Sequence, residues 1–175
     1  YFLPNGLSDP AHPEWGGWGG RFHLVGKRLY RDAADAVDGP ADPRATVWRW
    51  RPAFQADFQA RLDRCVNPFS EASHPPLAVL NNDRSRSVLR LAGARGARVP
   101  LSAAGSSDPD GHCLRCRWWV HRDAGGAAEL TGAERTDAEV AIPHDAAKPI
   151  HVILEVTDGG QPPLTAYRRA VIEPR

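Results

Sequence analysis

The sequence contains no methionine, has only two lysines, and has no apolar run long enough to cross a membrane. A bilayer-spanning helix needs roughly 18 or more apolar residues in a row, so we expect no membrane partner. The 22 basic residues nearly balance the 21 acidic ones, which gives a net charge of +1. A nucleic-acid-binding domain shows a basic excess, so we expect no nucleic-acid partner. A translated chain begins with Met, and its absence predicts a piece of a longer or processed protein, whose leader peptide would lie upstream.

Cysteine is also scarce. The odd count of three, Cys65, Cys113 and Cys116, argues against a disulfide framework. Cys113 and Cys116 have the spacing of a redox or zinc pair, but they lead directly into a predicted strand, and three extended residues span about 10 Å. A disulfide requires Cα atoms within about 7 Å, and no second pair is present to complete a zinc site. We therefore expect ordinary thiols.

Residues 1–80 are irregular and contain one predicted helix, in the run "RWRPAFQADFQARLDRCVNP". Pro52 suits the first helical turn, where its missing N–H costs nothing, and Asn67-Pro68 ends the helix. One apolar stripe follows the helical spacing and consists of Phe54, Phe58, Leu62 and Cys65. A single helix cannot bury such a stripe by itself, so we expect it to pack on an upstream part of the protein.

Residues 84–175 have a different pattern, with short strands at regular spacing after an extended linker over 73–83. Gly and Pro number 16 each, and turn signals such as "SSDPDG" and "DGGQPP" separate the strands. Seven segments are predicted strands: 87–93, 97–105, 114–121, 128–132, 138–143, 151–158 and 166–174. Seven short strands in about 90 residues are typical of an immunoglobulin-like sandwich. The sequence therefore predicts a mostly β protein, with an incomplete domain over 1–80 and a seven-stranded sandwich over 84–175.

The predicted strand "LRCRWWVH" places two neighbouring tryptophans on opposite faces. Leu114, Cys116, Trp118 and Val120 alternate with Arg115, Arg117, Trp119 and His121. Trp118 is expected in the core, which leaves Trp119 facing outward beside arginines. Trp119 is then either a stacking platform for a ligand or a contact that the first part of the chain covers.

The run "HPEWGGWGG", residues 12–20, places Trp15 and Trp18 among four glycines and next to Glu14. Aromatic rings stack on flat sugar faces and carboxylates accept hydroxyl hydrogen bonds, while glycine lets a backbone come close to a ligand. Together with Arg21, these residues form a candidate sugar-binding loop. The alternative is that the indoles pack on the protein and the glycines only permit the turn.

Several runs resemble the secreted bacterial cellulose-binding, nucleoside-hydrolase-like family. They are "NGLSDPAHPEWGGWGGRF", "VWRWRPAFQADFQARLDRCV", "SHPP", "VPLSAAGSSDPDG", "LRCRWWVH" and "HVILEVTDGGQPPLTAYRRAVI". The resemblance covers nearly the whole chain and implies that residues 1–80 are the tail of an α/β hydrolase-like domain, followed by a C-terminal sandwich. It also implies a secreted or periplasmic protein.

The resemblance further suggests functional residues. In nucleoside hydrolases a Glu and an Asn hold the sugar hydroxyls, so Asn5 with Glu14 is the candidate pair here, and a late His near the leaving group makes His74 a candidate acid. Such enzymes hold Ca²⁺ with an Asp cluster near the N-terminus, which the resemblance places in the upstream part of the parent protein. We expect no cofactor in this segment and no turnover by the segment alone.

Asp108, Asp110 and Asp158 lie in the two strongest turn signals of the C-terminal part. Clustered carboxylates suit hard cations such as Ca²⁺, but an Asp in a "DPDG" turn first of all bonds its own backbone. Two functions are thus compared below: binding of a polysaccharide or sugar ligand, and a spacer module with no ligand of its own. Burial of Trp119 would favour the spacer.

Overall fold

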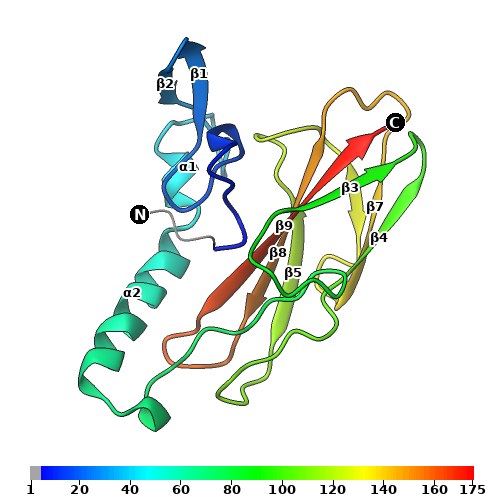
Figure 1. The fold of residues 1–175 in the computed structure, drawn as a ribbon. Helices are drawn as coiled ribbons and strands as arrows, with labels where there is room; N and C mark the ends of the chain where they lie inside the picture. The colour runs from blue at the N-terminus through cyan, green and yellow to red at the C-terminus, as the bar shows by residue number, and fades with distance from the viewer. Residues whose placement is uncertain (1–4) are drawn as a thin grey trace.

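The computed structural model describes residues 5–175 and shows two parts packed against each other (Figure 1). Residues 77–175 form two β-sheets around one hydrophobic core, here called the two-sheet domain. Residues 5–76, the N-terminal segment, carry the helices and a small hairpin. The protein is mostly β, as the sequence predicts.

Each of the seven predicted strand segments contains a strand. The first sheet has the order β3 (Leu89–Gly93), β9 (Thr165–Pro174), β8 (Ile150–Thr157), β5 (Arg115–Val120), and the second has the order β4 (Arg98–Ser102), β7 (Asp137–Ala141), β6 (Glu129–Thr131). All pairs are antiparallel except β3 with β9, where Leu89 faces Ala170 in parallel register. The immunoglobulin-like assignment of this arrangement stays a prediction.

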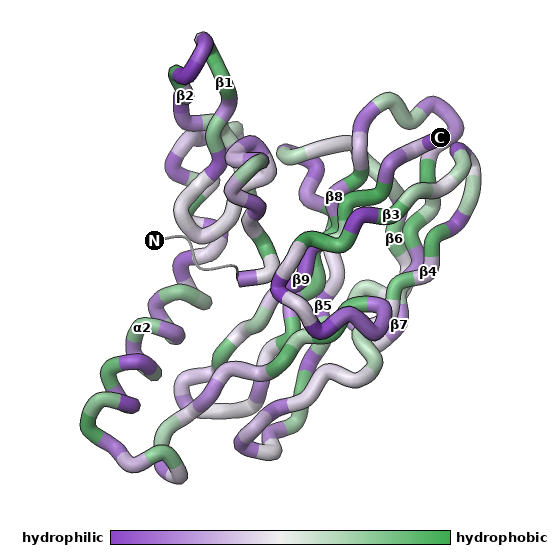
Figure 2. Tube along the Cα trace, viewed as in Figure 1, coloured by the Kyte–Doolittle hydropathy of each residue, from purple (hydrophilic) through white to green (hydrophobic). Residues whose placement is uncertain are grey.

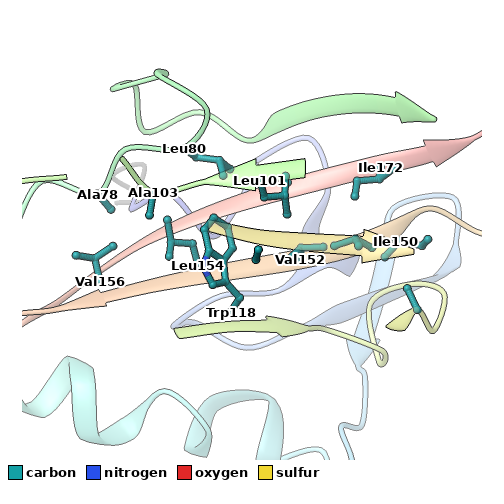
Figure 3. Close-up of a cluster of buried hydrophobic side chains, with 14 of the residues drawn as sticks. Ala78, Leu80, Leu101, Ala103, Trp118, Ile150, Val152, Leu154, Val156 and Ile172 are labelled. Carbon is teal, nitrogen blue, oxygen red and sulfur yellow. The ribbon is translucent and has the colours of Figure 1, made fainter. Parts of the chain in front are cut away.

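The core lies between the two sheets. Trp118 and Leu154 reach it from the first sheet, and Leu101 reaches it from the second (Figure 3). Val140 of the second sheet belongs to the same core. The alternation along β5 is as predicted, since Trp118 is buried and Trp119 points to the other face. β8 differs because its first five residues are all buried. A strand is buried on both faces when a second layer covers its outer side, and the N-terminal segment supplies that layer.

The N-terminal segment begins with the 3-10 helix η1 (Pro13–Trp15) and a hairpin of β1 (Phe22–Gly26) and β2 (Leu29–Asp32). It continues with α1 (Ala45–Trp48), α2 (Arg51–Val66) and η2 (Phe69–Glu71). α2 confirms the predicted helix, with Pro52 in its first turn and an extended Asn67 after its end. The hairpin was not predicted. Among the described helices, none is long and apolar enough to span a bilayer.

The apolar stripe of α2 faces mainly away from the two-sheet domain. Phe54 packs against the buried cluster at the interface, whereas Phe58, Leu62 and Val66 are 63%, 54% and 81% exposed. Ala60 is the buried residue of the helix. Hydrophobic and hydrophilic residues alternate along α2 in Figure 2. Most of the stripe lacks cover within the described chain, and its packing on an upstream part of the protein stays a prediction.

The boundary between the two parts lies earlier than the sequence predicted. Leu77 forms a bridge with Ser107 in the β4–β5 connection. Ala78 and Leu80 are 5% and 0% exposed and belong to the core between the sheets. Residues 77–80, predicted as linker, therefore pack as part of the two-sheet domain.

Candidate functional site

An aromatic cluster joins the N-terminal segment to the outer face of the first sheet. Trp50, immediately before α2, and Leu7 pack against Ile153 and Tyr167 of β8 and β9. Trp119 lies at the edge of this cluster, half-buried, with its ring centroid 5.7 Å from that of Trp50. The outward face of Trp119 is thus partly covered by the first part of the chain.

A buried ionic network lies beside this cluster. Asp35, from the loop after β2, is fully buried and accepts hydrogen bonds from Arg21 at 2.7 Å and Arg49 at 2.6 Å. Arg49 also lies 2.7 Å from the His121 imidazole and 3.3 Å from the Asp123 carboxylate. The network therefore connects the N-terminal segment to the residues that follow β5.

Burial and hydrogen bonding act in opposite directions on the pKa values in this network. Burial raises the pKa of Asp35, but hydrogen bonds from His121 and Arg21 outweigh it, so the pKa falls well below its usual range. Burial lowers the pKa of His121 to about 4, partly offset by its hydrogen bond to Asp35. At neutral pH the network thus contains a carboxylate held by guanidinium groups and a neutral imidazole.

The loop 12–20 packs on β8 instead of projecting outward. Trp15 is 6% exposed; its ring is stacked 3.9 Å from His12 and meets His151 edge-on at 5.2 Å. The fully buried Arg169 donates to the carbonyl oxygens of Leu7 at 2.6 Å and Gly16 at 3.1 Å, which holds the loop backbone on the sheet. Burial lowers the pKa of Arg169 to about 9, so its guanidinium remains charged at neutral pH.

The other predicted sugar-binding residues also have partners within the protein. Asn5 accepts the backbone N–H of Leu7, Glu14 pairs with His12 at 2.8 Å, and Arg21 is bound to Asp35.

The Trp18 ring meets Phe54 and Tyr167 edge-on, each at 6.2 Å. With its ring buried, Trp15 offers no free face for stacking on a sugar, and the geometry matches the packing alternative for this loop. A saccharide role for these residues stays a prediction.

Two adjoining hollows follow β5 along its open edge, and we call their lining residues the β5 groove. The first, of about 500 Å³, is lined by residues 118–120, 122 and 128–131. The second, of about 460 Å³, is lined by residues 114–117, 134, 136, 155 and 157. Trp119 connects the two hollows, because it lines the first and donates its indole N–H to Glu155, which lines the second, at 2.9 Å. Glu155 also faces Arg117 at 3.4 Å.

The predicted metal and acid candidates form two groups around the β4–β5 connection. His74 donates its backbone N–H to Asp110 at 2.7 Å, and its ring lies 2.9 Å from the same carboxylate. Burial raises the pKa of Asp110, but the hydrogen bonds from His74 outweigh it and the pKa is lowered. Asp108 and Asp158 approach each other together with His112. The pairing of His74 with Asp110 was not predicted.

Sequence reasoning missed the residues that hold the interface together, above all Asp35, His121, His151 and Arg169. One signal was present in the sequence. The run "TAYRRAVI" places two arginines inside an otherwise apolar strand, and a charged residue at such a position is buried only when it is paired. Both Arg168 and Arg169 are indeed buried and hydrogen-bonded.

Comparison with known proteins confirms the resemblance drawn from the sequence. Residues 98–174 match the family described as cellulose-binding protein Sde0182, C-terminal domain. A search of curated proteins gave no match to the chain. Among solved structures, the chain is similar to a nucleoside hydrolase-related hypothetical protein from Saccharophagus degradans that is associated with carbohydrate metabolism, with 34% identity and a TM-score of 0.83. The similarity covers 98% of this chain and 45% of that protein, so the chain spans less than half of its length.

Proposed function

We propose that the chain binds a polysaccharide along the β5 groove, and the match of residues 98–174 to the cellulose-binding protein Sde0182 C-terminal domain supports this proposal. The groove carries this proposal because it combines an aromatic ring with polar groups that are already oriented. Glu155 is fixed between the Trp119 indole and Arg117. Guanidinium and carboxylate groups hydrogen-bond sugar hydroxyls, and a ring beside them adds an apolar contact.

The shape of the groove suits an extended ligand. Its two hollows follow one another along a single strand and open to solvent, with charged side chains from Arg115, Arg122, Glu129 and Glu134 on their walls. Closed, mostly apolar pockets are typical of small-molecule sites. An open, polar groove favours a chain of sugar units over a single nucleoside as the ligand.

Retention on insoluble cellulose tests this proposal. Replacing Arg117 and Arg122 together with Ala removes donors from both hollows and leaves the core intact, since the Arg117 side chain is 68% exposed. Two lost hydrogen bonds at roughly 0.5–1.5 kcal/mol each predict a drop in affinity of about tenfold. The matched control is Arg98→Ala, which removes an arginine of similar exposure, 61%, from an Arg–Glu pair of the second sheet. Equal retention of the double variant and the wild type would remove the β5 groove from the site.

A second candidate function is that of a spacer without a ligand. The observation that favours it is the contact of Trp119 with Trp50, supported by Arg49 over the Trp119 ring at 5.0 Å. In this case Trp119 serves the interface between the two parts. The cellulose experiment separates the two functions, because a spacer is not retained at all.

We also propose a further domain of the whole protein as the partner of α2. Phe58, Leu62 and Val66 form an exposed row at helical spacing, and apolar patches of this kind mark interaction surfaces. The related solved protein is more than twice as long as the matched region, which supports an additional domain, in our view of the α/β hydrolase-like type. Addition of that domain should protect α2 amides from hydrogen exchange.

For the whole protein we propose hydrolysis of a glycosidic bond, with an N-glycosyl bond as the specific candidate. The likeness to the nucleoside hydrolase-related protein supports this proposal. His74 is the candidate acid in this chain, and Ca²⁺ belongs to the proposed upstream domain. A polysaccharide ligand also supports a secreted or periplasmic location. Release of free base from nucleosides by the full-length protein tests the reaction, and no release would reject it.

A further inference from the structure

Three segments that are distant in sequence meet at one polar cluster. Ser73 comes from the end of the N-terminal segment, Asp108 from the β4–β5 connection, and Asp158 from the β8–β9 connection. A carboxylate oxygen of Asp108, one of Asp158 and a ring nitrogen of His112 all lie within 4.8 Å of one another. The cluster lies outside the β5 groove and has no part in the proposed polysaccharide site.

Each carboxylate in this cluster has one satisfied oxygen and one without a partner. Asp108 Oδ1 accepts the backbone N–H groups of Asp110 at 3.0 Å and His112 at 2.9 Å. Asp158 Oδ1 accepts those of Gly160 at 3.0 Å and Leu164 at 2.8 Å. The Oδ2 atoms of both residues have no partner among the described residues, although each side chain is only about 1% exposed.

Ser73 adds a third oxygen without a partner. Its buried Oγ makes no hydrogen bond within the described chain. A Cβ built on Gly160 would lie 2.8 Å from Ser73 Oγ, 3.2 Å from Asp158 Oδ1 and 3.4 Å from the His112 ring. Glycine at position 160 therefore leaves open a space that borders Ser73 Oγ, the Asp158 carboxylate and the His112 ring.

The interface network shows what normally neutralises such a group of ligands. Asp35, His121 and Asp123 also lie within 4.8 Å of one another, and there the Arg49 guanidinium pairs with both carboxylates and contacts the imidazole. No Arg or Lys nitrogen of residues 5–175 lies within 4.0 Å of Asp108 or Asp158. Two buried carboxylates without a cation are costly, so a positive partner bound from outside the chain would stabilise this cluster.

We propose that Asp108, Asp158 and Ser73 bind a Ca²⁺ ion. The three free ligand atoms are oxygens, which hard cations prefer, and carboxylate and hydroxyl ligands suit Ca²⁺ better than Zn²⁺. His112 Nδ1 lies 3.2 Å from Asp108 Oδ1 and serves as a hydrogen-bond partner of that carboxylate. The ion would tie the end of the N-terminal segment to both connections of the two-sheet domain.

Thermal unfolding of the chelator-treated protein, with and without added CaCl₂, tests the site. Extracellular modules bind Ca²⁺ with dissociation constants of about 10⁻⁴–10⁻³ M. The CaCl₂ titration should therefore extend to about tenfold above this range or higher. At a concentration one hundred times the dissociation constant, we expect the Tm to rise by about 5–10 °C. No rise at any Ca²⁺ concentration overturns the proposal.

Asp158→Asn gives the sharpest comparison. Asn keeps the Oδ1 acceptor for Gly160 and Leu164 but removes one of the two facing charges. Without Ca²⁺, this variant should therefore unfold at the same temperature as the wild type or higher, and it should lose the rise with Ca²⁺. An equal rise in Asp158→Asn and the wild type contradicts the site.

Two further variants separate the alternatives. Asp42→Asn is the matched control, because Asp42 makes the same turn bond to the N–H two residues ahead, and it should keep the full Ca²⁺ response. His112→Ala should also keep it. A response to Zn²⁺ alone that disappears in His112→Ala would overturn the assignment to Ca²⁺.

Discussion

Removal of the Arg49 guanidinium tests whether the ionic network holds the N-terminal segment on the two-sheet domain. Arg49→Met keeps most of the apolar stem and deletes bonds of 2.6 Å to Asp35 and 3.3 Å to Asp123, together with the 2.7 Å contact with the His121 ring. Loss of one partner from a buried ion pair costs roughly 3–5 kcal/mol. Arg21 still binds the other Asp35 oxygen, and the Arg49 side chain is 14% exposed, so we expect about 2–4 kcal/mol of lost stability.

The assay is thermal and urea-induced unfolding followed by tryptophan fluorescence, since Trp50 and Trp119 adjoin the network. At about 2–4 °C per kcal/mol for a chain of this size, the Tm should fall by roughly 5–15 °C. Asp35→Asn in the Arg49→Met background should cost less than the sum of the single changes, because the two residues are in contact.

Arg44→Met is the matched control, since Arg44 pairs with Asp42 in an exposed position, with 69% of its side chain exposed. It should leave the Tm unchanged. If Arg49→Met and Arg44→Met unfold at the same temperature, or if the Asp35 and Arg49 changes are simply additive, the network does not hold the interface.

Three further predictions concern other parts of the structure. The pKa of His121 in the folded protein is lowered to about 4, so on acidification the unfolded chain, with a His pKa near 6.5, takes up the proton first. The stability from neutral His121 is therefore complete above about pH 6.5 and falls by on the order of 3 kcal/mol toward pH 4. A free energy of urea unfolding that does not change across this range would contradict this prediction. Gly6→Ala should destabilise the protein by about 2 kcal/mol or more, because Gly6 has φ +84° and an added Cβ would overlap the β9 backbone. Gly39→Ala, with open space around the added Cβ, should leave the Tm unchanged. Equal effects of the two changes would refute this prediction. Leu80→Ala should lower the free energy of unfolding by roughly 2–5 kcal/mol, as expected for truncation of a core side chain. Leu62→Ala should be nearly neutral, because Leu62 is 54% exposed. A larger loss from Leu62→Ala than from Leu80→Ala would contradict the placement of Leu80 in the core.

The sequence predicted the regular elements well where a pattern decides them locally. Alternation over "LRCRWWVH" correctly placed Trp118 inside and Trp119 outside, and Pro52 with Asn67-Pro68 correctly bounded α2. The β1–β2 hairpin was missed because all but one of its residues are exposed and so show no alternation of apolar and polar faces.

The interface could not be predicted, because its contacts join residues far apart in sequence. Arg169 is 162 residues from Leu7, whose carbonyl oxygen it binds, and His121 is 86 residues from Asp35. The loop 12–20 was a candidate sugar-binding loop because its tryptophans and glycines suit both stacking on a sugar and packing on the protein. Burial of Trp15 against His151 depends on a strand whose position no local pattern reveals.

Retention on insoluble cellulose is the most direct test of the proposed function. The full chain, with the paired Arg117→Ala and Arg122→Ala variant and the Arg98→Ala control, would be incubated with microcrystalline cellulose and the unbound protein measured. We predict retention of the wild type and of the control, with roughly tenfold weaker binding of the paired variant. Passage of the wild type into the unbound fraction, or equal retention of all three proteins, would contradict polysaccharide binding along the β5 groove.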